Sequence, residues 1–229
     1  MEEFFAWLGH LRDQSITTLN PLEVVNWNRH KFYLRELEKK GIGIIPTFFI
    51  EKGSDFSLTE LKSKGWEKAV IKPAISANSH LTELFHITDS KLVEEKYRRL
   101  AQHHDLLVQS FMPEIQTQGE ISLVFLGKPY SHAVQKKPAV SDFRVQADYG
   151  GKAEPFHANP AIIRAGNQIL SHIPCNLLYA RVDGIIHENQ FFLMELELIE
   201  PDLFFDHAPA ARGAFVEVAT LLLQSNHLP

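Results

Sequence analysis

Three carboxylates near the C-terminus are spaced so that they could act on one ligand. If residues 191–200 form a strand, alternate side chains point to opposite faces, and Glu195 and Glu197 share a face about 7 Å apart. The opposite face is then expected to carry Met194, Leu196 and Leu198. Asp183 lies across from Glu195 if the intervening turn holds three residues, 188–190. Neighbouring carboxylates repel unless they share a proton or bind a cation, and oxygen ligands suit Mg²⁺ or Mn²⁺. An amphipathic strand with solvated acids explains the same pattern.

Two lysines stand where they could meet an anion. Lys72 ends the apolar run Ala69-Val70-Ile71, so its ammonium either reaches water along the side chain or contacts a fixed anion such as a phosphate. Lys31 falls in a segment expected to be helical, where an exposed helix lysine is the simpler interpretation.

Arg144 lies in the polar segment 142–151, after the lysine pair Lys136 and Lys137. Its planar guanidinium could clamp a phosphate or a carboxylate, and Gly150-Gly151 lets the backbone approach a ligand closely. A surface loop is the alternative.

The elements that must position these residues follow from periodicity and from turn residues. Helices are expected before Ser15, from an Asn20 N-cap with Pro21 in the first turn to Lys40, and over 57–64, 89–103 and 208–224. Strands are expected over 42–50, interrupted by Pro46, and over 69–73 and 106–111. Two hairpins are expected, 121–126 with 130–134 and 177–186 with 191–199. Helices with antiparallel strands make an α+β fold.

Composition excludes several classes of protein. The 229 residues carry 23 basic and 28 acidic side chains, a net charge of −5 with a pI near 6.2, so no basic surplus is available for nucleic acid. The lone Cys175 closes no internal disulfide. No apolar run approaches the roughly 18 residues that span a bilayer, and the acidic N-terminus is unlike a signal peptide. We therefore expect a cytoplasmic protein without nucleic-acid or membrane partners.

The order of these residues resembles the ATP-grasp ligases of the glutathione synthetase-like superfamily, over about residues 20–205. The motifs 179–184, 195–201, 143–146 and 149–151 look most like the branch that contains the cyclo-ligase of cycloserine biosynthesis. The resemblance implies an ATP-grasp fold of two α+β subdomains with nucleotide and metal between them. Its implied boundaries are an N-terminal helical segment 1–46, a small lid subdomain 47–108 and a C-terminal subdomain 109–229.

The resemblance also implies a role for each matching residue. In the family, lysines matching Lys31 and Lys72 hold the ATP phosphates, and an acid near Glu120 takes the ribose hydroxyls. The hinge whose backbone meets adenine corresponds to Gln109, Ser110, Phe111 and Met112.

The catalytic and metal-binding roles are implied in the same way. The residue matching Arg144 contacts the transferred phosphate or the acyl-phosphate, and acids matching Asp183, Glu195 and Glu197 hold two Mg²⁺ ions. The expected cofactors are therefore ATP and Mg²⁺ or Mn²⁺, and the expected substrates are a small carboxylate and an amine or thiol.

Two departures from the family pattern bear on function. The loop 73–80 after Lys72 contains no glycine, whereas relatives carry glycines over the phosphates. Relatives also carry a further βα domain before the position of Phe4, so a homo-oligomer or a partner chain could supply that part.

Three functions stay open on the sequence. The first is an ADP-forming carboxylate–amine ligase, and the second is a nucleotide-binding remnant or subunit without independent ligase activity. The third is a metal-dependent hydrolase that uses the acid cluster alone.

Overall fold

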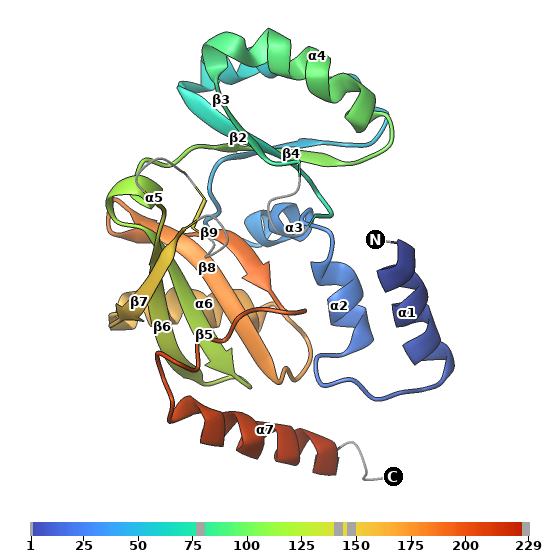
Figure 1. The fold of residues 1–229 in the computed structure, drawn as a ribbon, viewed down its shortest axis with the longest axis vertical. Coiled ribbons are helices and arrows are strands. Elements are labelled where there is room, and N and C mark those ends of the chain that lie inside the picture. Colours follow the sequence, from blue (N-terminus) through green and yellow to red (C-terminus); the bar gives the residue numbers. More distant parts are fainter. Residues whose placement is uncertain (1, 77–80, 140–143, 146–149, 226–229) are drawn as a thin grey trace.

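The computed structural model describes residues 2–76, 81–139, 144–145 and 150–225 and contains two antiparallel β-sheets, one above the other (Figure 1). The smaller sheet has the order β1-β4-β2-β3, and the larger has the order β7-β6-β5-β8-β9. In the smaller sheet the strands are β1 (Thr47–Ile50), β2 (Lys68–Pro73), β3 (Glu83–His86) and β4 (Leu106–Ser110). In the larger they are β5 (Glu120–Leu126), β6 (Tyr130–Lys137), β7 (Lys152–Phe156), β8 (Tyr179–His187) and β9 (Gln190–Glu197).

One face of the smaller sheet is covered by α4 (Ser90–Ala101) and the short helix η1 (Leu58–Lys64). α4 buries Val93, Tyr97 and Ala101, which recur at helical spacing against Ile71 and Val108 of the sheet. Because β2 alternates, burying Ala69 and Ile71 under α4 directs Lys72 to the opposite face, toward the larger sheet.

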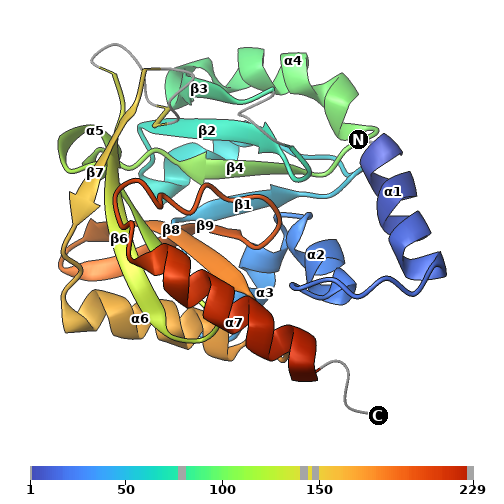
Figure 2. The same ribbon diagram turned by 60° about the horizontal axis from the view of Figure 1, so that its bottom comes forward.

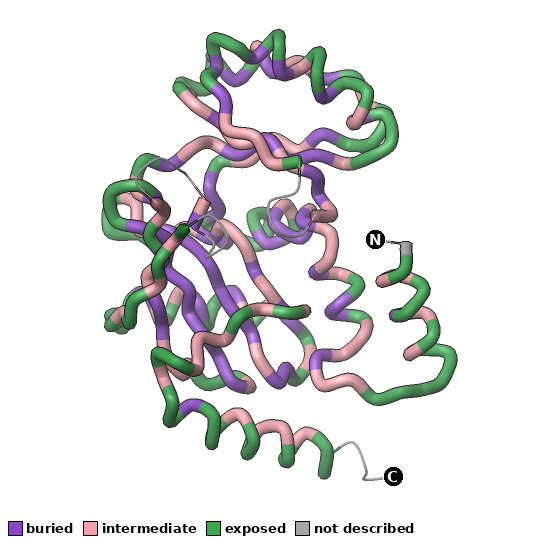
Figure 3. Tube along the Cα trace, viewed as in Figure 1, coloured by how far each residue is buried: buried purple, intermediate pink, exposed green. Residues whose placement is uncertain are grey.

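The larger sheet is covered on one face by α6 (Pro160–Ser171) together with α2 (Leu22–Asn28) and α3 (Tyr33–Lys39). Gly166 allows the close approach of α6, because a Cβ there would lie 2.7 Å from the ring of Phe125. α7 (Ala211–Ser225) lies on the opposite face of this sheet from α6 (Figure 2), where it packs around Val124 and Leu126. The strands β5 and β8 at the middle of the sheet are buried along most of their length, whereas α7 is largely exposed (Figure 3).

The chain passes from one sheet to the other at Pro46. Before it, Ile44 bridges to Leu193 of β9, and after it β1 pairs with β4. The expected interruption at Pro46 is therefore confirmed, and it separates pairing with two different sheets.

Side chains from the N-terminal segment hydrogen-bond the free backbone groups of the edge strand β9. Tyr33 Oη accepts from the Leu196 N–H at 2.7 Å, and Asn28 bonds both Leu196 O and the Leu198 N–H. Asn20 donates to Leu198 O at 2.7 Å and to Tyr179 O at 3.0 Å and accepts from the Leu178 N–H at 2.8 Å. The expected N-cap role of Asn20 is wrong: Pro21 precedes α2, and Asn20 is buried as a connector between strands.

The β8–β9 hairpin pairs Asp183 with Glu195, as expected, but through a different turn. The turn holds Glu188 and Asn189, both with positive φ (49° and 63°), as in a two-residue type I′ turn. A bulge at Asp183/Gly184 then restores the register. Gly184 is needed there because a Cβ would collide with the Phe192 carbonyl and the Phe191 ring.

The bulge changes which face Met194 occupies. Sequence alternation placed Met194 on one face with Leu196 and Leu198, but Met194 packs against the cluster around Met112, while Leu193, Leu196 and Leu198 enter the core of the larger sheet. The expected position of Met194 is therefore wrong, because alternation fails across a bulge.

Most expected elements are present, including both hairpins and the helix at 89–103. β7 and α6 were not expected, and α1 (Glu2–Asp13) begins the chain. No helix in the described ranges is both long and apolar enough to cross a membrane.

Replacement of Asn20 by alanine tests how far the connector role contributes to stability. Asn20→Ala should lower the free energy of unfolding by about 2–4 kcal/mol, because buried backbone groups of β8 and β9 lose their partners. Urea unfolding measures the change, with the exposed Asn26→Ala as the control. Equal stabilities of the two variants would contradict the role.

Candidate active site

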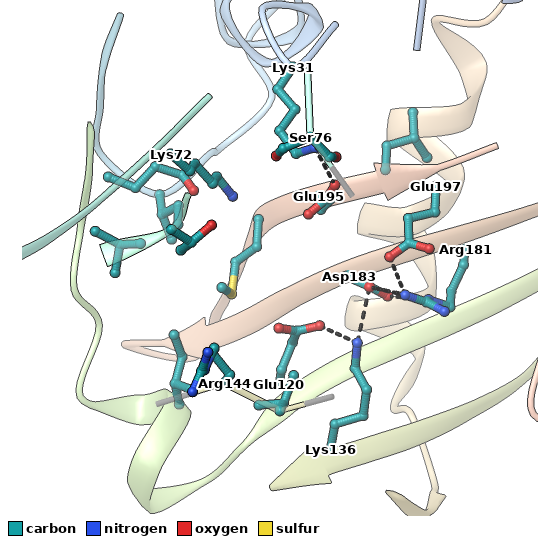
Figure 4. A pocket seen from close by; sticks show the side chains of 18 of the residues that line it. Lys31, Lys72, Ser76, Glu120, Lys136, Arg144, Arg181, Asp183, Glu195 and Glu197 are labelled. Atoms are coloured by element: carbon teal, nitrogen blue, oxygen red, sulfur yellow. Dashed lines mark hydrogen bonds and ion pairs between the residues drawn. The ribbon is translucent and has the colours of Figure 1, made fainter. Parts of the chain in front are cut away.

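A cavity of about 490 Å³ lies between the two sheets and collects most of the chemically distinctive residues. Lys72 enters it from the smaller sheet, Glu120 and Asp183 from the larger sheet, and Lys31 from the helical segment (Figure 4). All the residues expected to bind nucleotide or metal line this cavity except Met112, and so does Arg144.

Asp183 is buried in the floor of the cavity, 2% exposed, between two cations. Arg181 donates to it through Nε at 3.0 Å and Nη2 at 2.8 Å, and Lys136 Nζ lies 3.1 Å from its Oδ2. Burial alone would raise the pKa of Asp183, but Arg181 and Lys136 hold that pKa well below its usual range. Asp183 is therefore a fixed anion.

The same two cations reach the neighbouring acids. Lys136 forms an ion pair with Glu120, and Arg181 forms one with Glu197. Burial raises the pKa of Glu120. Burial and the charge of Asp183 raise the pKa of Glu197 to about 8, so this carboxyl holds a proton up to unusually high pH and would ionise more readily beside an added cation.

Lys31 reaches Glu195 from the turn between α2 and α3. Its Nζ lies 3.2 Å from Glu195 Oε1 and donates to Ser76 O at 2.9 Å. The turn is fixed where the Lys31 N–H donates to Ala74 O at 2.8 Å and His30 Nε2 lies 2.9 Å from Asp105 Oδ2. Lys31 is 7% exposed, so the interpretation as an exposed helix lysine is wrong.

Lys72 faces the cavity opposite Glu195 (Figure 4). Burial lowers the pKa of Lys72, and Lys31 lowers it further, whereas Glu195 opposes the change. A desolvated ammonium between another lysine and a carboxylate is well placed to receive an anion, since a second negative charge would relieve the repulsion between the lysines.

One end of the cavity is apolar. Met112 is buried with Ile45, Ile115, Val145 and Ile185, and Phe192 and Met194 pack against this group. The segment from Gln109 to Met112 passes along this end. Gln109 Nε2 donates to Thr47 Oγ1 at 3.2 Å, and the Ser110 and Phe111 N–H groups donate to Pro46 O and Lys68 O. This end suits a flat apolar ligand, with the charged groups further along the cavity.

Arg144 lines the cavity together with Val145 and Gly151. The other residues of its motif, Phe143 and 146–149, lie outside the described residues, as do 77–80 of the loop after Lys72. Gly150 has a φ of 79°, a conformation that favours glycine.

The acids expected to bind metal are instead paired with basic side chains in this structure. Asp183, Glu195 and Glu197 face one cavity, but each contacts a basic side chain. Within the described part of the chain, no three acidic, histidine or cysteine side chains are arranged to hold a metal ion. Their oxygen donors fit Mg²⁺ in type, and because burial and the charge of Asp183 raise the pKa of Glu197, a cation beside it would favour its ionised form.

Lys136 and Arg181 line the cavity and pair with its acids, but the sequence analysis did not select them as site residues. A signal was present, since Arg181 lies two residues before Asp183 and therefore on the same strand face. Lys136 pairs in register with Glu120 across β5 and β6, which only the register reveals.

Similarity to known proteins identifies the fold to which this site belongs. No protein-family model matches the sequence. The chain is 26% identical over 219 residues to the cycloserine biosynthesis protein DcsG of Streptomyces lavendulae, which covers 88% of this chain and 71% of that protein.

Solved structures match more of the chain. D-cycloserine synthetase DcsG superposes with a TM-score of 0.83 at 21% identity, over 97% of this chain and 80% of that one. The D-alanine–D-alanine ligase of Bacillus anthracis gives 0.70 at 16% identity, over 96% and 76%. A RimK domain ATP-grasp protein from Sphaerobacter thermophilus gives 0.67 at 15% identity, over 93% and 74%.

Two sheets that enclose a charged cavity, with these neighbours, define an ATP-grasp fold. The structural neighbours of the chain are ATP-grasp ligases, and DcsG is similar over most of its length. The resemblance seen in the sequence is thereby confirmed for the fold.

Removal of Lys136 tests the ion-pair network. Lys136→Met should lower the free energy of unfolding by about 3 kcal/mol or more at neutral pH, because it leaves the buried Glu120 and Asp183 short of a cation. Lys137→Met is a matched control, since its ion pair with Glu154 spans 3.9 Å and is largely exposed. Chemical unfolding of both variants measures the change. Similar losses of unfolding free energy in the two variants would contradict the role of Lys136.

Proposed function

We propose that this chain is an ATP- and Mg²⁺-dependent ligase that joins a small carboxylate to an amine, or to a thiol, through an acyl-phosphate, with release of ADP. The observation that carries the proposal is that one cavity combines an apolar end, two lysines and a group of carboxylates. The similarity to DcsG and to D-alanine–D-alanine ligases, which are ATP-grasp ligases, supports it.

The cavity suits the three parts of ATP. The apolar residues around Met112 and Met194 would receive the adenine, with the backbone of Ser110 and Phe111 beside it. Glu120 would reach the ribose hydroxyls, and Lys31 and Lys72 would hold the phosphates.

Ligand binding would exchange the partners of the charged residues. Phosphate oxygens would bind Lys31 and Lys72, and Glu195 would then be released from its ion pair with Lys31. Asp183, Glu195 and Glu197 would then hold Mg²⁺, which supplies neutralisation of the phosphate charge when bound. Each buried charge keeps an opposite charge throughout, so the exchange avoids a large desolvation cost.

The reaction has two steps in which this chain mainly orients groups. A carboxylate oxygen attacks the γ-phosphorus, the bond to ADP breaks, and an acyl-phosphate forms. The amine nitrogen then attacks the acyl carbon, inorganic phosphate leaves, and one proton departs from the nitrogen. Arg144 would hold the transferred phosphoryl group at the cavity wall while charge develops on it.

Nucleotide affinity tests the placement of the phosphates. Lys72→Ala should weaken Mg-ATP binding by about 1–3 kcal/mol, the scale of a charge-assisted hydrogen bond. Titration calorimetry measures it, with the exposed Lys62→Ala as the control. Unchanged affinity in Lys72→Ala would remove the lysine from the phosphate site.

Turnover separates a ligase from a protein that only binds nucleotide. An ADP-release screen over acids and amines should find at least one active pair, and Arg144→Ala should reduce that rate about 10²-fold with nucleotide affinity nearly unchanged, because loss of a transition-state contact acts on the rate. The exposed Arg164→Ala is the control. Nucleotide binding without turnover of any pair would favour the binding remnant instead.

A further inference from the structure

The apolar end of the cavity depends on the contact between α5 (Glu114–Thr117) and β8. α5 begins two residues after Met112 and carries Ile115, which lines the cavity. Ile115 packs in one buried group with Ile185 of β8. This group is the apolar wall of the cavity and consists of Ile45, Met112, Ile115, Val145 and Ile185. The position of α5 on β8 therefore shapes the wall.

A polar pair joins α5 to β8 at the edge of the apolar wall. His187 Nδ1 of β8 lies 2.5 Å from Glu114 Oε1 of α5, and the two side chains are 40% and 16% exposed. Glu114 directly precedes Ile115. His187 shares a face of β8 with Ile185, because alternate residues of a strand point to the same side. The pair therefore fixes α5 to β8 beside the wall residues that these two elements contribute.

The Glu114 carboxylate depends on this contact. Its second oxygen, Oε2, is buried and accepts no hydrogen bond from the described residues. A buried carboxylate oxygen without a donor is costly, so loss of the bond to Oε1 would leave the whole group unsatisfied. The same bond is the main cause that raises the pKa of His187, so the imidazolium, which donates the stronger hydrogen bond, persists to higher pH. Without His187, Glu114 is expected to turn toward water and to draw α5 away from β8.

The imidazole ring of His187 also contacts the residues that pack on the wall. Its centroid lies 5.9 Å from that of the Phe192 ring, with the planes at 72°, an edge-to-face arrangement. Phe192 is paired in register with Ile185 and packs against the wall. His187 is therefore linked to the wall through α5 on one side and through Phe192 on the other.

We propose that Glu114 and His187 are positioning residues for the base of the nucleotide, which hold α5 against β8 and so keep the apolar wall in place for adenine. Neither is among the described residues that line the cavity, so both act through the wall. The role toward adenine rests on the proposed function, whereas the hold of the pair on the wall does not.

The chain offers a matched control, because ion pairs near the surface often contribute little. Glu94 of α4 pairs with Arg98 at 2.5 Å and is 14% exposed, so its distance and burial are close to those of Glu114. α4 covers the face of the smaller sheet opposite to Lys72 and the cavity. Glu94→Met therefore reports the loss of a comparable ion pair without a change at the wall.

Hydrogen exchange tests the hold on the wall without any ligand. Amide exchange over residues 111–119 of the full chain, read by mass spectrometry, should be about tenfold faster in His187→Phe and in Glu114→Met than in wild type, because local opening of α5 becomes easier. In Glu94→Met the exchange of this segment should match wild type. Unchanged exchange in both pair variants would overturn the positioning of α5 by the pair.

ATP affinity tests the role toward the base. His187→Phe removes the donor but keeps an aromatic ring beside Phe192, and Glu114→Met removes the acceptor at similar size. Each should weaken Mg-ATP binding in calorimetry by about fivefold or more, while Glu94→Met stays within about twofold of wild type. Unchanged affinity in both pair variants, or an equal loss in Glu94→Met, would overturn the proposal.

Two further variants show whether the residues act as a pair. Glu114→Gln should bind ATP within about twofold of wild type, because its amide oxygen can still accept from His187 Nδ1. The double variant His187→Phe with Glu114→Met should bind no more weakly than the weaker single variant, as expected of residues that act as one unit. A loss in Glu114→Gln as large as that in Glu114→Met, or losses that multiply in the double variant, would overturn the pair.

The two measurements separate this proposal from the proposed function. A chain that binds no ATP would overturn the proposed ligase and with it the role toward adenine, while hydrogen exchange would still decide whether the pair holds the wall. ATP binding that is the same in wild type and in both pair variants would overturn only the positioning role.

Discussion

The cost of burying charge governs the centre of this molecule. Asp183 and Glu120 lie in the floor of the cavity, where an unpaired carboxylate would be strongly destabilising. Lys136 and Arg181 offset that cost by contacting two carboxylates each. Because a buried ion pair requires close geometry, the strands that carry these residues must keep one register, and the surrounding core serves to fix it.

The N-terminal helices belong to this site although they are far from it in sequence. β9 carries Glu195 at the edge of the larger sheet, and an open edge would leave its backbone groups unpaired. Asn20, Asn28 and Tyr33 satisfy that edge with side chains in place of another strand. The same segment places Lys31 beside Glu195. The N-terminal segment therefore both satisfies the sheet edge and contributes a lysine to the cavity.

The lining of the cavity between the two sheets changes along its length, from apolar to charged. The chain crosses between them near Pro46 and again after Ser110, and the apolar residues around Met112 gather at these crossings. Ion pairs occupy the middle, and the segment around Phe204 closes the far end. A ligand with an apolar ring, then anionic groups, then a reacting centre would meet matching surroundings in that order.

The sequence alone determined the α+β class, both hairpins and the residue types of the cavity, because these depend on local periodicity and on turn residues. It paired Asp183 with Glu195, yet through the wrong turn, since a two-residue turn and a bulge give the same register as a three-residue turn. The orientation of Met194 and the burial of Lys31 depend on contacts between segments far apart in the chain. The Arg181–Asp183 pair lies within one strand and had a local signal, but the pairs of Lys136 with Glu120 and of Arg181 with Glu197 arise only when strands meet. The physical reason is that electrostatic and packing energies act through space, so contacts between strands leave no local pattern in the sequence.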